Sequence, residues 1–258
     1  MIFAGCDVGS LTSKAVVLSG NRILGSAVIR SRTMPEETAR KVMDEALAKA
    51  GLSMKDVKGF GGTGYGRDKI GFVNHVNSEI ACHARGARWL VPNARTVIDI
   101  GGQDCKAMRL AEDGSITKFL ANDKCAAGTG RFLEVMAKAL GVPIEELGKL
   151  SARAKKPVCL ASTCTVWAQA DVVSYLNAGE TIEDLGAGIN NAMANRVATL
   201  ANSVKPDRDV CMTGGVAKNQ GVVRALEKLL GYSIVIPRKA DPQLAGAIGA
   251  ALLAAEAV

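Results

Sequence analysis

Two of the seven cysteines have neighbours that suit metal binding. Cys125 lies in the segment NDKCAAGTGRF (122–132), and Cys164 lies in STCTV (162–166). Each precedes a stretch with helical periodicity, so we expect each cysteine to open a helix. Backbone N–H groups at a helix start are unpaired and the helix dipole is positive there, which favours a thiolate and any anionic cluster bound to it.

Two thiolates are half of the ligands that a [4Fe–4S] cluster or a structural zinc requires. The other half could come from a second copy of the chain across a two-fold axis. From the residues alone, Cys125 and Cys164 could equally be metal ligands or ordinary packed side chains. Cys159 also stays open, because it has C-x₄-C spacing to Cys164 but lies in a predicted strand, 157–161. We expect the remaining cysteines to be buried apolar residues: Cys6, Cys82, Cys105 and Cys211.

Composition excludes several classes of protein. The chain has 258 residues and a net charge of +7, but its basic residues are dispersed, which argues against nucleic-acid binding. The residues before Asp7 lack a secretory n-region, and the apolar stretch 245–258 is shorter than the ~20 residues of a membrane span. An odd number of cysteines without disulfide-like spacing favours a reducing compartment. We therefore expect a cytoplasmic protein that binds no membrane.

Two stretches of the chain resemble each other. Apolar strands are predicted over 2–7 and 96–100, with Asp7 as the last residue of the first and Asp99 as the penultimate residue of the second, and each continues through a glycine turn into hairpins. This pattern predicts a duplicated unit. The other predicted elements are strands over 57–62, 210–212 and 233–236, and helices over 35–51, 78–90, 130–140, 165–176, 184–204, 220–230 and 242–255.

The glycine turns that follow these strands suit phosphate binding. Their backbone amides, the hydroxyls of Ser10, Thr12 and Ser13, and the charge of Lys14 can all face phosphate oxygens. Asp7 and Asp99 are placed to hold Mg²⁺ through water. A third turn, 213–219, enters a helix and suits a nucleotide. The loop 62–67 could either contact the nucleotide or simply cross between the domains, and the sequence does not decide between these two roles. No Gly-x-x-x-x-Gly-Lys-Ser/Thr motif occurs, which excludes a P-loop enzyme.

This arrangement of turns resembles the superfamily of actin, sugar kinases and heat-shock chaperone ATPases, an α/β fold with two ribonuclease-H-like domains that clamp ATP. We place the first domain at 1–92, completed by the C-terminal helix 242–258, and the second at 93–241. The resemblance implies catalytic roles for Asp7, Asp99 and Gln103. It implies nucleotide contacts at Gly9, Ser10, Leu11, Thr12, Ser13, Lys14, Gly101, Gly102, Gln103, Gly214, Gly215, Val216, Asn219 and Gln243.

The cysteine segments, together with IDIGGQD (98–104), make the resemblance more specific. They resemble the activator (archerase) proteins of 2-hydroxyacyl-CoA dehydratases, in the BadF/BadG/BcrA/BcrD ATPase family. That family also contains the ATPase parts of benzoyl-CoA reductases and the reductases of double-cubane cluster proteins. The resemblance implies a homodimer that shares one [4Fe–4S] cluster, with Cys125 and Cys164 as the two ligands from each subunit.

The function implied is ATP-dependent transfer of one electron to a partner iron–sulfur enzyme: a dehydratase, a benzoyl-CoA reductase or a double-cubane protein. A ferredoxin or flavodoxin would be the donor, and ATP/ADP, Mg²⁺ and the cluster the cofactors. Two alternatives remain, a small-molecule kinase of the same superfamily and a nucleotide-dependent scaffold with a bridging zinc. His75 and His83 receive no role.

Overall fold

The chain forms two compact units, each built on its own sheet. The computed structural model describes residues 1–122, 125–160 and 164–258. The first unit comprises residues 1–95, 110–117 and 237–258, and the second comprises 96–109 and 118–236. No helix in the described ranges is long and apolar enough to cross a membrane.

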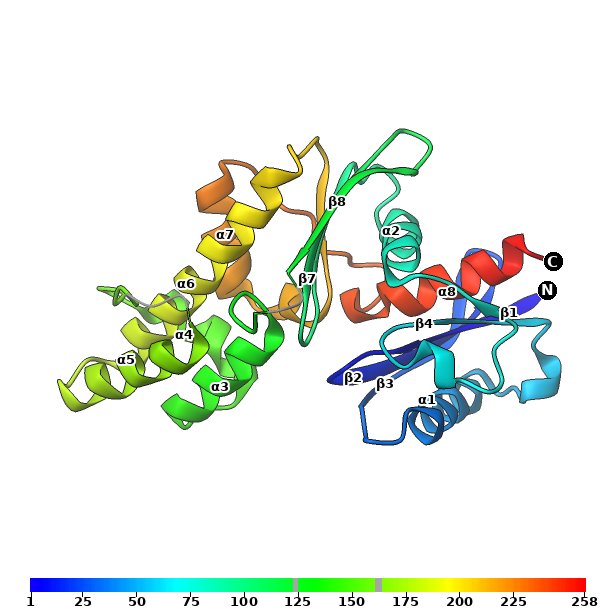
Figure 1. Ribbon diagram of the computed structural model, residues 1–258, viewed down its shortest axis with the longest axis horizontal. Coiled ribbons are helices and arrows are strands. Elements are labelled where there is room, and N and C mark those ends of the chain that lie inside the picture. Colours follow the sequence, from blue (N-terminus) through cyan, green and yellow to red (C-terminus); the bar gives the residue numbers. More distant parts are fainter. Residues whose placement is uncertain (123–124, 161–163) are drawn as a thin grey trace. The chain divides into compact units, whose positions relative to one another are not determined.

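The first unit contains a five-stranded sheet with the order β3-β2-β1-β4-β5 (Figure 1). β1 pairs antiparallel with β2 and parallel with β4. The strands are β1 (Ile2–Val8), β2 (Thr12–Ser19), β3 (Arg22–Arg30), β4 (Gly59–Thr63) and β5 (His75–Val76). The helices are α1 (Pro35–Ala50), α2 (Glu79–Leu90) and α8 (Ala245–Glu256).

Strand alternation divides the core of this unit between two helices. Ala15 and Val17 of β2 pack into the cluster that contains α1, whereas Val16 and Leu18 pack into the cluster that contains α8. Successive side chains of a strand point to opposite faces, so α1 and α8 cover opposite faces of the sheet (Figure 1). A Cβ atom at Gly5 would overlap the carbonyl oxygen of Ala247, so glycine allows α8 to approach β1 closely.

The second unit contains a four-stranded sheet with the order β8-β7-β6-β9. Its strands are β6 (Thr96–Ile100), β7 (Cys105–Leu110), β8 (Ile116–Asn122) and β9 (Val210–Thr213). Its helices are α3 (Gly130–Leu140), α4 (Leu147–Arg153), α5 (Thr165–Asn177), α6 (Ile182–Ser203) and α7 (Gln220–Leu230). The core joins Ile98 and Ile100 of β6 to Met136 of α3 and Met193 of α6.

The strand registers confirm the predicted duplication. Asp7 pairs with Lys14 across the β1–β2 hairpin, and Asp99 pairs with Lys106 across the β6–β7 hairpin. On the other side, Asp7 lies beside Thr63 of β4, and Asp99 lies beside Thr213 of β9. Each aspartate is therefore held at the same position of an equivalent sheet.

Two local predictions need correction, and one helix was missed. The strand predicted over 233–236 is only a bridge between Val235 and Cys211, so β9 has little pairing on that side. The strand predicted over 157–161 is absent from Pro157–Leu160, while Ala161 lies outside the described residues. Instead, Val158 N–H donates to the carbonyl of Asp184 at 3.2 Å, which ties this segment to α6. Helix α4 was not predicted, whereas α3 and α7 match their predicted bounds.

Candidate functional site

The first aspartate turn, residues 7–14, surrounds a buried carboxylate. Asp7 is 1% exposed and its Oδ2 accepts from Lys14 Nζ at 3.1 Å. No hydrogen-bond donor among the described residues reaches its Oδ1. Ideal Cβ atoms built on Gly64 and Gly246 would lie 2.6 Å from Oδ1 and 2.8 Å from Oδ2, respectively. Glycine at both positions therefore leaves space beside the carboxylate.

Ser31, which the sequence analysis missed, closes this turn. Its hydroxyl donates to the carbonyl of Gly9 at 2.6 Å and lies 2.9 Å from Ser13 Oγ. Ser13 is fully buried, because it shares a face of β2 with the core residue Ala15. Ser13 thus supports the turn from inside, and its predicted contact with phosphate stays a prediction. Ser10, Leu11 and Thr12 are half-buried.

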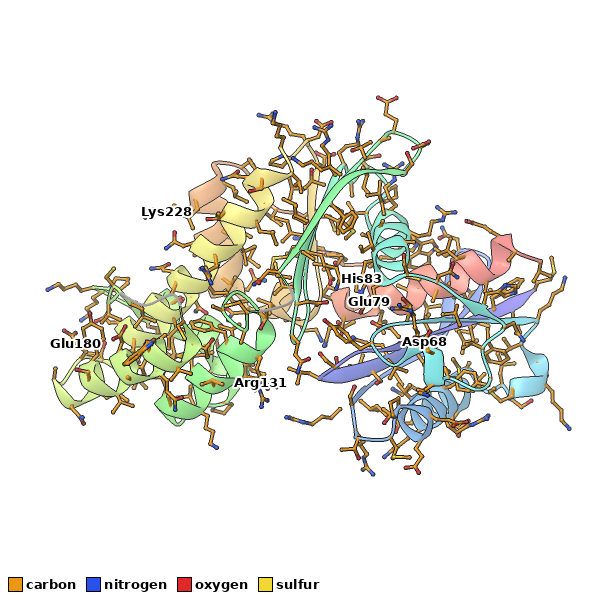
Figure 2. All side chains as sticks on the ribbon, viewed as in Figure 1. Asp68, Glu79, His83, Arg131, Glu180 and Lys228 are labelled. Carbon is orange, nitrogen blue, oxygen red and sulfur yellow. The ribbon has the colours of Figure 1, made fainter. Side chains whose placement is uncertain are left out.

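A histidine that sequence reasoning left without a role lies near Asp7. His83 is 6% exposed, and Figure 2 shows it with Glu79 on α2. Its Nε2 would lie 3.0 Å from an ideal Cβ on Gly246, the same Cβ that would lie 2.8 Å from Asp7 Oδ2. An imidazole and a carboxylate therefore face the same glycine of α8. A lone histidine in a helix gives no sequence signal that it lies near a particular carboxylate.

The second aspartate turn, residues 99–104, also surrounds a buried carboxylate. Asp99 is 1% exposed, and its Oδ1 accepts from Thr213 Oγ1 at 2.6 Å. The N–H of Gly101 donates to the carbonyl of Asp104 at 2.9 Å, which closes the turn. Asp104 forms an ion pair with Lys106. Gln103 is exposed at the tip, whereas Gly101 and Gly102 are half-buried.

The third turn, residues 213–219, follows β9. Gly214 has φ +84°, and a Cβ there would overlap the carbonyl oxygen of Ile100, so this position requires glycine. Gly215 begins a 3₁₀ helix that ends at Lys218, and Val216 packs into the core. Gly64 follows β4 with φ +95° and is the counterpart of Gly214 in the duplicated unit. This equivalence favours a nucleotide contact over a domain-crossing role for the loop 62–67.

Asn219 caps helix α7. Its Oδ1 accepts from the N–H groups of Gly221 and Val222 at 2.9 and 3.1 Å, and its Nδ2 donates to Asn190 Oδ1 at 3.0 Å. These contacts hold the third turn to α6. A nucleotide contact of Asn219 stays a prediction. Gln243 lies in the 3₁₀ helix Pro242–Leu244, with its N–H bonded to Asp241 Oδ1 at 2.9 Å.

Replacing Asn219 by alanine is expected to destabilise the protein. The variant loses the cap of α7 and leaves the buried Asn190 Oδ1 without its donor, at a cost of about 1–2 kcal/mol. Urea unfolding followed by circular dichroism measures the change. Gln220→Ala, at the exposed next residue, is the control. Equal midpoints for the two variants would contradict the capping role.

The cysteines fall into a buried group and an accessible group. Cys6, Cys82, Cys105 and Cys211 are buried, and burial raises the pKa of all four thiols, to about 12 for Cys82 and Cys211. Cys125 is half-buried, and Cys159 and Cys164 are exposed. Among the described residues, no three His, Cys, Asp or Glu side chains gather closely enough to hold a metal ion.

The two predicted cluster ligands differ in their relation to the helices. Cys164 is the N-cap of α5, and its carbonyl accepts from Ala168 N–H at 2.8 Å, as predicted for a helix start. Cys125 does not open α3, which has Thr129 as its N-cap. Gly128, with φ +86°, lies in the non-helical turn between Cys125 and α3. The helix start therefore lies five residues after the cysteine.

The loop that carries Cys125 is tied to its surroundings by side chains. Asn122 Nδ2 donates to the carbonyls of Cys125 and Ala127 at 3.2 and 3.0 Å. Thr129 Oγ1 donates to the carbonyl of Ala126 at 2.6 Å. These bonds link the end of β8 to residues 125–129, which lead into α3.

Helix α3 is bonded directly to the second aspartate turn. The N–H groups of Gly130 and Arg131 donate to the carbonyls of Gly101 and Gly102, both at 2.8 Å. Figure 2 labels Arg131 at the start of this helix. Two of the helix's unpaired N–H groups are thus satisfied by the turn. A candidate nucleotide turn and the segment that follows Cys125 form one hydrogen-bonded structure.

Known proteins resemble this chain along its whole length. The 2-hydroxyisocaproyl-CoA dehydratase activator of Clostridioides difficile is 45% identical over 98% of this chain and 95% of its own. The (R)-2-hydroxyglutaryl-CoA dehydratase activating ATPase of Acidaminococcus fermentans is 46% identical over 97% of this chain and 95% of its own. A solved structure of the Clostridium difficile activator with bound ADPNP superimposes with a TM-score of 0.95 at 44% identity, covering 100% and 95% of the two chains.

More distant structures share the fold alone. A ROK-family glucokinase from Streptomyces griseus, solved with glucose and AMPPNP, has a TM-score of 0.62 at 15% identity and covers 99% and 100% of the two chains. The predicted superfamily fold is thereby confirmed, as is the predicted class of enzyme, an ATPase. The family model matches residues 4–254, and the chain belongs to the BadF/BadG/BcrA/BcrD ATPase family.

Proposed function

We propose that this ATPase is an activator that transfers one electron, at the expense of ATP, to an iron–sulfur enzyme of the 2-hydroxyacyl-CoA dehydratase or reductase type. The relatives named as dehydratase activators support the acceptor class. The observation that carries the proposal is the hydrogen-bonded junction of Gly101 and Gly102 with Gly130 and Arg131. It connects the turn proposed to bind phosphate to the helix that follows the cysteine proposed to bind the cluster.

Both aspartate turns contribute to nucleotide binding in this proposal. The free Oδ1 of Asp7 has the chemistry of a ligand for hydrated Mg²⁺, because a buried carboxylate oxygen without a donor is costly unless a cation or its water approaches. Asp99, held by Thr213, is the matching group of the second turn. Exposed Gln103 and the amides of Gly9 and Gly102 would donate to the phosphate oxygens of a bound nucleotide. When bound, Mg²⁺ neutralises charge that develops on the phosphates.

The donor set supports Cys125 and Cys164 as ligands of a [4Fe–4S] cluster. They are accessible, while the thiols of Cys6, Cys82, Cys105 and Cys211 are buried with raised pKa. Four thiolates are needed, so we propose a homodimer in which both copies contribute two. Val166 and Trp167, 72% and 67% exposed beside Cys164, offer an apolar surface for that contact. When bound, the cluster carries one electron at a time.

The chain's own residues provide the coupling. A change in the position of Gly101 or Gly102 on nucleotide binding moves the acceptors of the Gly130 and Arg131 amides. Because hydrogen bonds weaken steeply with distance and angle, α3 must follow or lose both bonds. Lifting one electron by ~300 mV requires ~7 kcal/mol, which is a reason to couple transfer to ATP hydrolysis. A ferredoxin or flavodoxin in the cytoplasm is the proposed donor.

The proposal predicts that ATP changes the accessibility of iron. The anaerobically purified protein should be brown with broad visible absorbance, and bathophenanthroline should remove its iron at different rates with and without ATP. A colourless protein that contains zinc would contradict the cluster. A chelation rate that is indifferent to nucleotide would contradict the coupling.

Gly130→Ala tests the junction itself. A Cβ at this position would lie 3.0 Å from the carbonyl oxygen of Gly101, so the helix start must shift away from the turn. We expect normal iron content but a much smaller effect of ATP on the chelation rate. Lys138→Ala, on the exposed face of the same helix, is the control and should respond as the unmodified protein does. An unchanged response in Gly130→Ala would place the coupling elsewhere.

A further inference from the structure

An arginine lies beside the sulfur of Cys125. Arg196 of α6 donates from Nη2 to Cys125 Sγ at 3.4 Å and is half-buried. Its guanidinium is planar and permanently charged, so it places a fixed positive charge at this sulfur. The residue belongs to none of the motifs that define the nucleotide turns or the cysteine segments.

The backbone around Cys125 is shaped to admit Arg196. Gly128 has φ +86°, and an ideal Cβ on it would lie 3.3 Å from Arg196 Cβ, closer than ordinary packing allows. Asn122 fixes the same loop through the carbonyls of Cys125 and Ala127. Contacts from Asn122 of β8 and from Gly128 therefore hold the described residues 125–128 against Arg196 of α6.

Cys125 also needs such a partner more than Cys164 does. Cys164 is the N-cap of α5, where helix N–H groups and the helix dipole favour a thiolate. The dipole effect falls off within the first turn, and Cys125 lies five residues before α3. Arg196 supplies at Cys125 the positive charge that the start of α5 supplies at Cys164.

We propose that Arg196 is a positioning residue that holds Cys125 Sγ and raises the reduction potential of the cluster assigned to this cysteine. The inference rests on the proposed function. Reduction adds negative charge, which a neighbouring cation stabilises, and hydrogen bonds to ligand sulfurs are a known lever on cluster potential.

The test is a redox titration of reconstituted Arg196→Met, followed by electron paramagnetic resonance. Methionine keeps an unbranched stem but removes the charge and the donors. At a fixed solution potential we expect the ratio of reduced to oxidised cluster to fall about tenfold, which is about 59 mV for one electron. Arg196→Lys keeps the charge without the planar fork and should shift the ratio less.

Arg153→Met is the matched control, because it removes the same charge from the second unit. Arg153 is exposed on α4, 3.7 Å from Glu183. Equal potentials for Arg196→Met and Arg153→Met would overturn the proposal. If Arg196→Met folds but retains no iron while Arg153→Met retains its full iron content, the result would support the positioning role. Absence of a cluster from the unmodified protein would instead overturn the proposed function.

Discussion

Replacing either Cys125 or Cys164 by alanine is expected to remove nearly all of the iron. The unmodified homodimer should contain about four irons, bound by two cysteines from each copy. Loss of one cysteine per chain removes two of the four ligands from a shared site, because the two-fold axis doubles every substitution. Iron analysis after anaerobic reconstitution measures the result, and size-exclusion chromatography should show weaker dimerisation, since bound metal stabilises the assembly that holds it.

The matched controls are Cys82→Ala and Cys211→Ala. Both thiols are buried, and burial raises the pKa of each to about 12, which disfavours the thiolate that binds iron. Full iron content is expected in both. Cys159→Ala decides the reading left open by the C-x₄-C spacing, because Cys159 is exposed as Cys164 is. A full complement of iron in Cys125→Ala would contradict the ligand assignment.

The framework of the site could be predicted from local sequence. A buried strand followed by an aspartate and a glycine turn occurs twice, and the registers place Asp7 and Asp99 at equivalent positions. Strand alternation could also have shown that Ser13 points inward, since it lies two residues before the core residue Ala15. The αL tendency of Gly128 could have moved the predicted helix start away from Cys125.

Other parts of the site depend on contacts between distant segments. Ser31 reaches Gly9 across 22 residues, and Arg196 reaches Cys125 across 71 residues. A single serine or arginine carries no periodic or spacing signal that reveals its partner. The bonds from Gly130 to Gly101 and from Arg131 to Gly102 are between backbone atoms, so the side chains cannot encode them individually. Only the packed fold brings these groups together.

Replacing Asp7 or Asp99 by asparagine is expected to lower Mg²⁺-dependent ATP hydrolysis by about 100-fold or more, as removal of one electrostatic group from a transition state commonly does. Asparagine keeps the size of the side chain, and in Asp99→Asn its amide oxygen can still accept from Thr213 Oγ1, which donates to Asp99 Oδ1 at 2.6 Å. The charge is lost while the fold is preserved. Steady-state ATPase assays with varied Mg²⁺ measure the effect.

The same variants should keep their iron, because the carboxylates and the cysteines belong to different segments. Asp113→Asn is the control, since Asp113 lies exposed in the hairpin between β7 and β8. Hydrogen bonds that its carboxylate accepts from Ser115 lower its pKa, and it belongs to neither aspartate turn. This variant should hydrolyse ATP normally. Normal hydrolysis in both Asp7→Asn and Asp99→Asn would contradict the assignment of the two turns. Loss of iron together with hydrolysis in Asp99→Asn would mean that iron binding depends on the second aspartate turn, through the hydrogen bonds of α3 to Gly101 and Gly102.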